Sequence, residues 1–490
     1  MKILLSYLRR FIADNFLLCI VFFGATFFFL FQHALSLSWD FSSYVLNAQC
    51  YFYDGMYCET QRPPLASFLL APFLLFGVFG EYLYIFGVSL LFLYATVQTA
   101  DVFFEKRRVS LSDKEFFRFI LYFCSLSSFT LLMGLKEGTE LLTLSLLELS
   151  FVQILRGKNA GFYMGLAFLA RYPSLVFVPF LLFNSKLKGI LKNFGSFLLI
   201  IFPWFLWNFV VYGNWFTSFI DGYAQNIALR QMMIAFSWAD IFIVANFFLI
   251  PALIGILIVF KESVCKPFWK NNREFLLIAL VAFIIIWNYV TIPTKFPRYL
   301  FNLILPLAFF SSITGIFVSH YLKKYKREIT FILFLLFLVT LVFTTIKIVQ
   351  DTRYNLPFEQ AAEDIQKLRL SNCEILSPHW VPVTYYTENV YPLGYHAVEQ
   401  AVMSNKTVLI FHGDRTPDDS FSEDDLKRLP VFYSTEEYTF FAKESVKEIC
   451  APKYKYNEPY VQDHCALLAS KFSFLKNLVK MVCLKINRIP

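Results

Sequence analysis

The chain has 490 residues, of which 57% are hydrophobic, 20% aromatic and only 16% charged. This apolar content excludes a disordered chain, a collagen-like repeat and an ordinary soluble enzyme, because only lipid can act as the solvent for so many apolar side chains. The net charge of +8 does not indicate a nucleic-acid partner, since the Lys and Arg residues form short clusters between apolar segments.

Apolar stretches recur from residue 16 to residue 347, and about 20 such residues in a helix cross a hydrocarbon core of about 30 Å. Placing the basic clusters between them in the cytoplasm puts the N-terminus inside. The first helix, predicted over 15–37, then leads outward, so that residues 38–62 form the first external loop. The clusters are Lys2/Arg9/Arg10, Lys106/Arg107/Arg108/Lys114, Arg156/Lys158, Lys186/Lys188/Lys192, Lys261/Lys266/Lys270/Arg273 and Lys323/Lys324/Lys326/Arg327.

Two later segments fit this orientation only if neither of them makes a single crossing of the membrane. Residues 63–79 must lie along or dip into the outer face, and residues 161–183 must enter and return with a turn at Arg171-Tyr172-Pro173. With the first helix there are about nine crossings, and the hairpin brings the total to about eleven membrane helices. The other predicted spans are 82–104, 116–133, 141–155, 194–212, 241–260, 275–293, 299–318 and 329–348.

From about Gln350 the composition becomes that of a soluble protein. We therefore predict a membrane domain over 1–349, an α/β domain over 350–470 on the extracytoplasmic side, and a basic amphipathic segment over 471–490 that lies on the membrane surface. Residues 358–370 are expected to form a helix, and 373–376, 407–411, 431–433 and 438–441 to form strands. The pairs Cys50/Cys58 and Cys450/Cys465 are either disulfides or free buried thiols.

Charged residues at the outer membrane boundary are few, and each is therefore a candidate for function. They include the acids Asp54 and Glu59 and the cation Lys136, and the site candidates among them are the acids Asp40, Glu137 and Glu140 and the cations Arg62, Arg171, Lys295 and Arg298. Transfer of a group from an anionic lipid needs both kinds, because a carboxylate takes the proton of an attacking hydroxyl while cations hold the departing phosphate. Structural alternatives remain open for most of them, because Asp40, Glu137 and Glu140 could be acids at helix ends and Arg62 and Arg298 could anchor at lipid headgroups. Arg171 differs, since an arginine in the middle of an apolar hairpin is costly without a partner.

The first external loop resembles that of C-type (GT-C) glycosyltransferases of the family 39 group. This group includes protein O-mannosyltransferases and lipid A aminoarabinose transferases. The similar stretches run in order over roughly residues 1–320. They are Trp39-Asp40 with Tyr44 and Asn47-Ala48, Arg62-Pro63-Pro64-Leu65, Gly165 to Tyr172, Pro203-Trp204 with Asn208 and Gly213-Asn214, and Arg298-Tyr299-Leu300 with Pro306.

The resemblance implies an inverting glycosyltransferase that uses a dolichyl or undecaprenyl phosphate sugar, with a protein, glycan or lipid acceptor on the extracytoplasmic side. Asp40 matches the general base of that group, and Glu137 or Glu140 its second acid. Arg62, Arg171, Lys295 and Arg298 would bind the donor phosphate, and Tyr44 and Tyr299 the substrate. Phe41 stands where many relatives have an acid, and the loop has no Asp-X-Asp motif, so no metal cofactor is expected.

Two other classes of function remain open at this point. A secondary transporter or flippase for a lipid-linked or small anionic substrate would also use a broken hairpin with an intramembrane arginine. A non-catalytic membrane anchor for the 350–470 domain is the third class, and it would make Asp40 and Arg62 dispensable.

Overall fold

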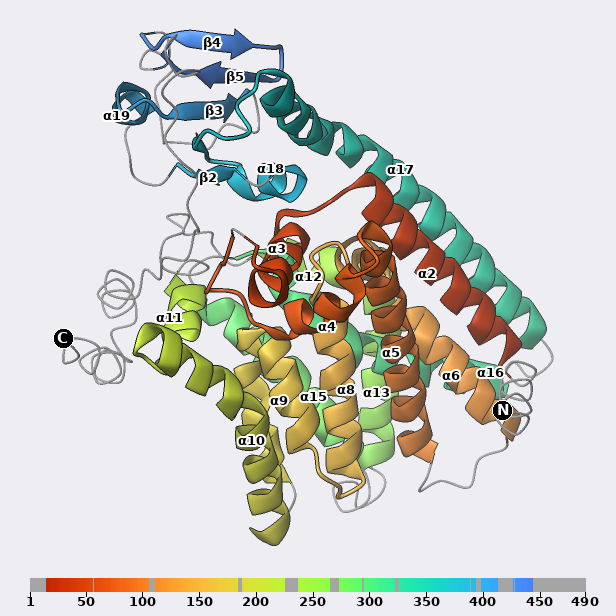
Figure 1. Cartoon of the computed structure of the whole chain (residues 1–490). Helices are drawn as coiled ribbons and strands as arrows, with labels where there is room; N and C mark the ends of the chain where they lie inside the picture. Colours follow the sequence, from red (N-terminus) through yellow and green to blue (C-terminus); the bar gives the residue numbers. More distant parts are fainter. Residues whose placement is uncertain are drawn as a thin grey trace, which may run out of the picture.

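A computed structural model gives the structure of the chain. It describes residues 15–55, 57–104, 111–183, 187–224, 237–264, 273–292, 295–321, 326–387, 389–393, 398–412, 426 and 428–443. A helical bundle carries a small sheet at one end (Figure 1). The predicted segment 471–490 and the pair Cys450/Cys465 lie outside the described residues.

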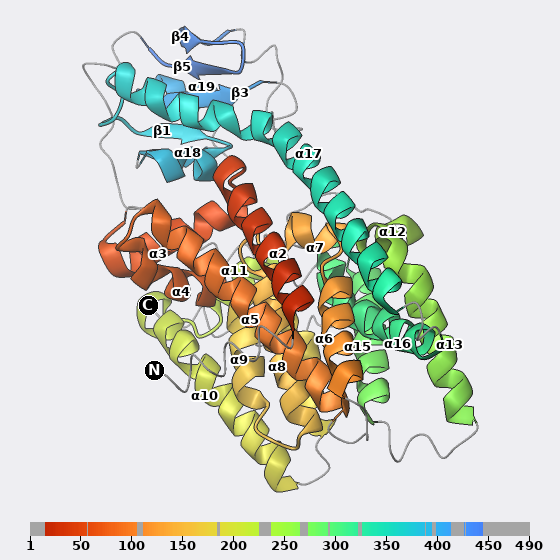
Figure 2. The same cartoon turned by 90° about the vertical axis from the view of Figure 1, so that its right-hand side faces the viewer.

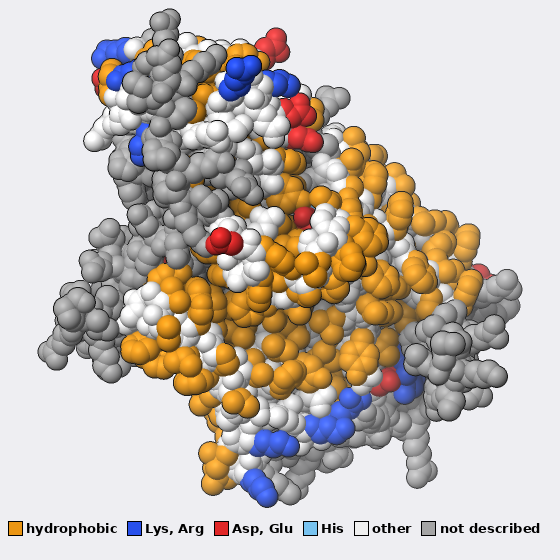
Figure 3. All heavy atoms as spheres, viewed as in Figure 1, with side chains coloured by type: hydrophobic (Ala, Val, Ile, Leu, Met, Phe, Trp, Pro, Cys, Tyr) orange, Lys and Arg blue, Asp and Glu red, His pale blue; other side chains and the backbone are white. Residues whose placement is uncertain are grey.

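Among the residues that the structure describes, six helical stretches are long and apolar enough to cross a membrane, which makes the chain an integral membrane protein. Hydrophobic side chains cover the face of the bundle in Figure 3, with Lys and Arg at the end of the bundle away from the sheet, and charged side chains of both signs lie over the sheet. The predicted total of about eleven membrane helices stays a prediction. The six stretches are Phe16–Leu35, Val78–Phe103, Leu187–Tyr212, Trp238–Lys261, Pro297–Val318 and Thr330–Gln350.

The bundle consists of α-helices and 3₁₀ helices. In chain order they are α2 (Phe16–Leu35), α3 (Trp39–Tyr53), α4 (Leu65–Leu74), α5 (Val78–Phe104), α6 (Leu111–Ser125), α7 (Ser128–Met133), α8 (Glu140–Leu155), α9 (Gly161–Ala170), η1 (Tyr172–Phe183), α10 (Leu187–Tyr212), α11 (Thr217–Tyr223), α12 (Trp238–Ala245), η3 (Asn246–Phe248), α13 (Leu249–Val264), α15 (Arg273–Thr291), η4 (Pro297–Leu303), α16 (Ile304–Tyr321) and α17 (Lys326–Lys367).

The segment predicted as a hairpin folds back on itself along α8. At the start of α9, the Ala160 carbonyl accepts a hydrogen bond from Ser150 Oγ at 3.1 Å, near the end of α8. At the turn, Arg171 has an extended backbone and contacts Glu140, the first residue of α8. The returning 3₁₀ helix η1 then packs Phe180 against the end of α8. The chain therefore places Arg171 at the same end of the bundle as the start of α8.

Several predicted boundaries are wrong. Residues 38–62 do not form a loop throughout, because α3 occupies Trp39–Tyr53. The span predicted over 116–133 is broken after Ser125, where Ser127 caps the new helix α7. The span over 241–260 is broken at Asn246, whose φ of 49° is incompatible with a continuous α-helix.

The span predicted over 329–348 and the helix predicted over 358–370 are one helix, α17. It runs beside α2 and carries the chain from the bundle to the sheet (Figures 1 and 2). The expected division between residues 349 and 350 therefore falls inside a continuous helix.

The C-terminal part forms a five-stranded mixed sheet in the order β2-β1-β3-β5-β4. β1 pairs in parallel with β2 and β3, while β5 pairs antiparallel with β3 and β4. The expected strand over 373–376 is shifted slightly, and α18, β2 and α19 were not expected. The elements are β1 (Ile375–Ser377), α18 (Trp380–Tyr386), β2 (Val390–Pro392), α19 (Val398–Met403), β3 (Thr407–Phe411), β4 (Val431–Ser434) and β5 (Tyr438–Phe441).

Helix α18 joins the sheet to the bundle at α3. Trp380 is buried, and its ring lies 4.5 Å from that of Tyr57 and 6.4 Å from that of Trp39, measured between centroids. The Tyr385 hydroxyl donates to Glu81 Oε1 on α5 at 2.8 Å. The side chains of Trp380 and Tyr385 are therefore part of the junction between sheet and bundle.

Candidate active site

Asp40 lies in the first turn of α3, and a serine fixes the start of that helix. The Oγ of the N-cap residue Ser38 accepts a hydrogen bond from the Phe41 amide at 3.1 Å and donates to the Lys136 carbonyl at 2.6 Å. Gly138, in the loop between α7 and α8, has a φ of +87°, and a Cβ there would lie 3.1 Å from the Phe41 ring. Two loops distant in sequence therefore hold Asp40 in place.

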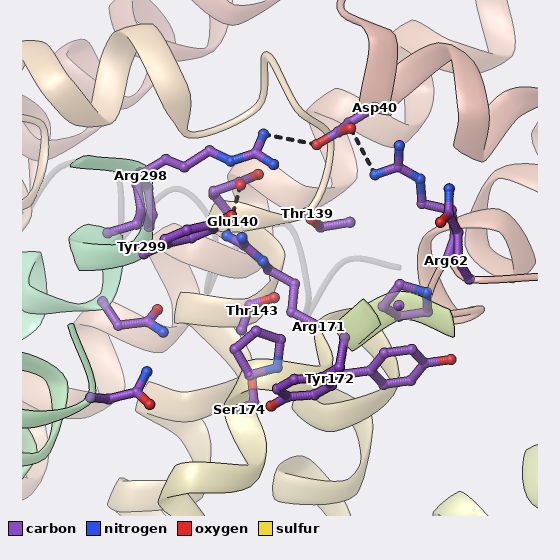
Figure 4. Close-up of a pocket in the computed structure, with 18 of the residues that line it drawn as sticks. Asp40, Arg62, Thr139, Glu140, Thr143, Arg171, Tyr172, Ser174, Arg298 and Tyr299 are labelled. Atoms are coloured by element: carbon purple, nitrogen blue, oxygen red, sulfur yellow. Dashed lines mark hydrogen bonds and ion pairs between the residues drawn. The ribbon is translucent and has the colours of Figure 1, made fainter. Parts of the chain in front are cut away.

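The Asp40 carboxylate lies between two arginines (Figure 4). Its Oδ1 is 2.7 Å from Arg62 Nη1, and its Oδ2 is 2.9 Å from Arg298 Nη1. The three side chains are mostly buried, with exposed fractions of 16%, 13% and 19%. Burial by itself raises the pKa of Asp40, but the charges of Arg62 and then Arg298 outweigh it and hold the pKa well below its usual range. Asp40 is therefore ionised at neutral pH.

A network of polar groups fixes Arg62 from the other side. Arg62 Nε is 3.0 Å from Glu59 Oε2, and Gln61 Nε2 donates to Glu59 Oε1. The Glu59 backbone exchanges two hydrogen bonds with the Asn47 side chain on α3, at 2.7 and 2.9 Å. A disulfide between Cys50 and Cys58 joins the same two segments. Of the two alternatives for Cys50 and Cys58, a disulfide or free thiols, the structure contains the disulfide.

Glu137 lies on the other side of the Asp40–Arg298 contact. Its Oε2 is 3.6 Å from Arg298 Nη1, and 16% of its side chain is exposed. Burial, followed by the negative charge of Asp40, raises the pKa of Glu137 to about 7, although Arg298 opposes the shift. Two acids with very different pKa values thus share one arginine.

Arg171 and Glu140 form a second ion pair deeper in the bundle, with Arg171 Nη1 2.7 Å from Glu140 Oε1. Glu140 is only 1% exposed. Its other oxygen, Oε2, has no hydrogen-bond partner among the residues that the structure describes. The pair lies below Asp40 in the view of Figure 4.

These groups surround one pocket, which contains about 970 Å³ of empty space with its open mouth included. Segments from α3, α8, η1, α11, α15 and η4 enclose it. Of the predicted site residues, it brings together Asp40, Tyr44, Arg62, Glu140, Arg171, Arg298 and Tyr299. The guanidinium carbons of Arg62 and Arg298 each lie 5.9 Å from an aromatic ring, those of Tyr44 and Tyr299.

Two predicted residues do not line the pocket. Glu137 reaches it only through its contact with Arg298. Lys295 is 9% exposed, and its ammonium donates to the Ile292 carbonyl at 2.7 Å. The expected role of Lys295 in holding a phosphate is therefore not supported by its position.

Several lining residues were not predicted. Thr143, Ser174, Asn288 and Asn302 contribute uncharged polar groups, for which the sequence offers no signal because such residues are frequent in membrane helices. The spacing of Glu59 and Arg62, three residues apart, could have indicated their ion pair. In the part of the chain that the structure describes, no group of three or more His, Cys, Asp or Glu side chains is arranged to hold a metal ion.

Comparison with known proteins gives a match in structure only. No family model matches the chain, and no curated protein matches its sequence. Two crystal structures of ArnT from Cupriavidus metallidurans, one in the apo state and one bound to undecaprenyl phosphate, each superpose with a TM-score of 0.58 at 12% identity. The match covers 91% of this chain and 100% and 99% of the two ArnT chains. The chain thus shares the fold of these two ArnT structures, and the resemblance seen in the sequence is confirmed at the level of the fold.

Proposed function

We propose that the chain is a membrane glycosyltransferase that moves a sugar from a polyprenyl phosphate to an acceptor hydroxyl, with Asp40 as the general base. The observation that carries the proposal is the convergence of Asp40, Arg62, Arg171 and Arg298 on one pocket from four distant segments. The shared fold supports it, because one of the two ArnT structures is bound to undecaprenyl phosphate. A carrier of that class, undecaprenyl or dolichyl phosphate, is the donor we propose.

The proposed step is a single displacement with inversion. The acceptor oxygen forms a bond to the anomeric carbon, the bond from that carbon to the phosphate oxygen breaks, and its electron pair leaves with the phosphate. Asp40 takes the proton of the acceptor hydroxyl. Arg62 and Arg298 stabilise the phosphate as its charge increases, while Arg171 stays paired with Glu140.

The contacts of Asp40 suggest how donor binding prepares the base. In the structure, Arg62 and Arg298 are counter-ions of Asp40, which keeps its pKa low and its basicity weak. A phosphate in the pocket competes for both guanidinium groups. When it takes over these contacts, the pKa of Asp40 rises, and the carboxylate becomes a stronger base only when a donor is present.

The pocket lies near the sheet, because Asp40 is on α3, where α18 joins the sheet to the bundle. This position supports catalysis on the extracytoplasmic side. Lys and Arg gather at the end of the bundle opposite the sheet, and basic residues favour the cytoplasmic face (Figure 3). We therefore place the N-terminus in the cytoplasm and the sheet outside.

The test is transfer of labelled sugar from undecaprenyl and dolichyl phosphate donors to a membrane extract by purified protein. We expect wild type to form product and Asp40→Asn to be slower by about 10² or more. Asp54→Asn is the matched control, since it makes the same charge change at the end of the same helix, outside the pocket lining. Equal rates for wild type and Asp40→Asn would remove Asp40 from the mechanism. Movement of intact donor across liposome membranes without a covalent product would instead identify a flippase.

A further inference from the structure

Three buried side chains at the deep end of the pocket have unused hydrogen-bonding atoms. Glu140 and Thr143 are each 1% exposed and Ser174 is 2% exposed. Glu140 Oε2, Thr143 Oγ1 and Ser174 Oγ have no hydrogen-bond partner among the described residues, and all three residues line the pocket. We call these three residues the polar end of the pocket. A buried polar atom without a partner costs about 1–3 kcal/mol, so three of them in one cavity indicate a place where a ligand supplies the partners.

The fold places the polar end on two elements that meet at Arg171. Glu140 and Thr143 are three residues apart on α8 and so face the same way. Ser174 follows the turn into η1, where its amide donates to the Arg171 carbonyl at 3.0 Å. In Figure 4, Thr143 and Ser174 lie below Asp40 and Arg298, with Glu140 at a height between them. The pocket therefore has a charged end near Asp40 and a polar end beneath it.

The chemistry of the polar end disfavours a phosphate. Among the described lining residues, Arg171 is the cation beside it, and its ion pair with Glu140 already neutralises that charge. Glu140 Oε2 belongs to the carboxyl group that pairs with Arg171 and so acts as an acceptor, which means that its ligand must donate a hydrogen bond, as an ionised phosphate oxygen cannot do. The hydroxyls of Thr143 and Ser174 both donate and accept. This set matches the hydroxyl groups of a sugar.

We propose that the polar end binds the ring hydroxyls of a sugar, and so selects the sugar that the lipid phosphate carries. The inference rests on the proposed function for the identity of the carrier. With the phosphate at Arg62 and Arg298 and the anomeric carbon beside Asp40, the far side of the ring points toward Glu140, Thr143 and Ser174. One ring hydroxyl donates to Glu140 Oε2, and others exchange hydrogen bonds with the two side-chain hydroxyls. Asn288 and Asn302, which also line the pocket, add amide donors and acceptors.

The test compares two kinds of probe by equilibrium binding to the purified protein in detergent. The first is farnesyl phosphate, and the second is farnesyl phosphate that carries glucose, galactose, mannose or xylose. We expect at least one sugar-bearing probe to bind wild type about tenfold tighter than farnesyl phosphate. Thr143→Val and Ser174→Ala should each weaken binding of that probe by about 5- to 10-fold, the loss expected for one hydrogen bond, and leave farnesyl phosphate affinity within about twofold.

Two further variants separate this role from a general effect on packing. Thr143→Ser keeps a hydroxyl and should retain most of the affinity for the sugar-bearing probe. Ser145→Ala is the matched control, because Ser145 is buried on the same helix but donates to the Leu141 carbonyl at 2.7 Å and does not line the pocket. It should bind both kinds of probe as wild type does.

Three results would overturn the assignment. The first is that no sugar-bearing probe binds tighter than farnesyl phosphate. The others are that Thr143→Val and Ser174→Ala bind all probes as wild type does, or that both variants lose affinity for the two kinds of probe by the same factor. Sugar transfer measured on the same samples separates this inference from the proposed function. A wild-type protein that prefers a sugar-bearing probe through Thr143 and Ser174 but transfers nothing supports the polar end as a sugar site and refutes the transferase. A protein that transfers sugar while both variants bind like wild type refutes the polar end alone.

Discussion

Replacing Glu137 by glutamine is expected to remove a pH dependence of stability that wild type shows between about pH 4.5 and pH 7. Glu137 lies beside the contact between Asp40 and Arg298, 3.6 Å from the guanidinium group. Burial and the charge of Asp40 raise its pKa from 4.5 to about 7. In the folded protein this carboxyl group therefore holds its proton over a range in which the unfolded chain releases it.

The sign and size of the effect follow from that shift. Below pH 4.5 the carboxyl group is protonated in both states, and its contribution to stability is fully present. As the pH rises through 7, the folded protein must accept a buried negative charge, and the contribution is lost. A shift from 4.5 to about 7 corresponds to a loss of at most about 3 kcal/mol. Glutamine cannot ionise and does not show this loss.

The assay is thermal unfolding of the purified protein in detergent at a series of pH values from 4.5 to 8. We expect Glu137→Gln to gain stability relative to wild type as the pH rises. All other titrating groups are common to the two proteins, so the difference between the profiles isolates Glu137. Glu363→Gln is the control, since that side chain is 61% exposed on α17. Parallel profiles for Glu137→Gln and wild type would refute the burial and charge argument.

Three further predictions concern other parts of the account. Arg298→Lys should weaken binding of undecaprenyl phosphate about tenfold or more, because a lysine ammonium group cannot hold two oxygens in the planar geometry of a guanidinium group. An unchanged Kd would contradict the role of Arg298 in binding the phosphate. Cys50→Ser and Cys58→Ser should each cost about 2–4 kcal/mol of stability, measured by thermal unfolding without reductant, and the double variant should lose no more than either single one. Tyr385→Phe should lower the midpoint of thermal unfolding, because it removes a hydrogen bond to Glu81 that stabilises the fold by about 1–3 kcal/mol, while sugar transfer persists. An unchanged midpoint would argue against a stabilising junction between the sheet and the bundle.

The charged part of the site was predictable from the sequence, and the polar part was not. Asp40, Arg62 and Arg298 stand out because charges are rare at the outer boundary of a membrane protein, where burial is costly. The same reasoning could not separate Arg298 from Lys295, which lies three residues earlier and bonds to a backbone carbonyl instead. Thr143 and Ser174 gave no signal, because hydroxyl groups in membrane helices usually bond to their own backbone.

The fold was predicted best where a single physical rule decides. The turn at Arg171 follows from the basic clusters on both sides of the segment, and β3 and β5 match their apolar runs. Helix α3 was missed although Ser38 at its start and the left-handed Asp54 at its end suit helix termini. Helix α17 was divided in two because its composition changes, yet the backbone continues through Pro357 without a break.

The most direct test of the central claim is a structure of the purified protein with undecaprenyl phosphate bound. We expect the phosphate in the pocket, within about 3 Å of the guanidinium groups of Arg62 and Arg298, with Asp40 no longer paired to at least one of them. A phosphate bound outside this pocket, with both contacts of Asp40 intact, would contradict the account.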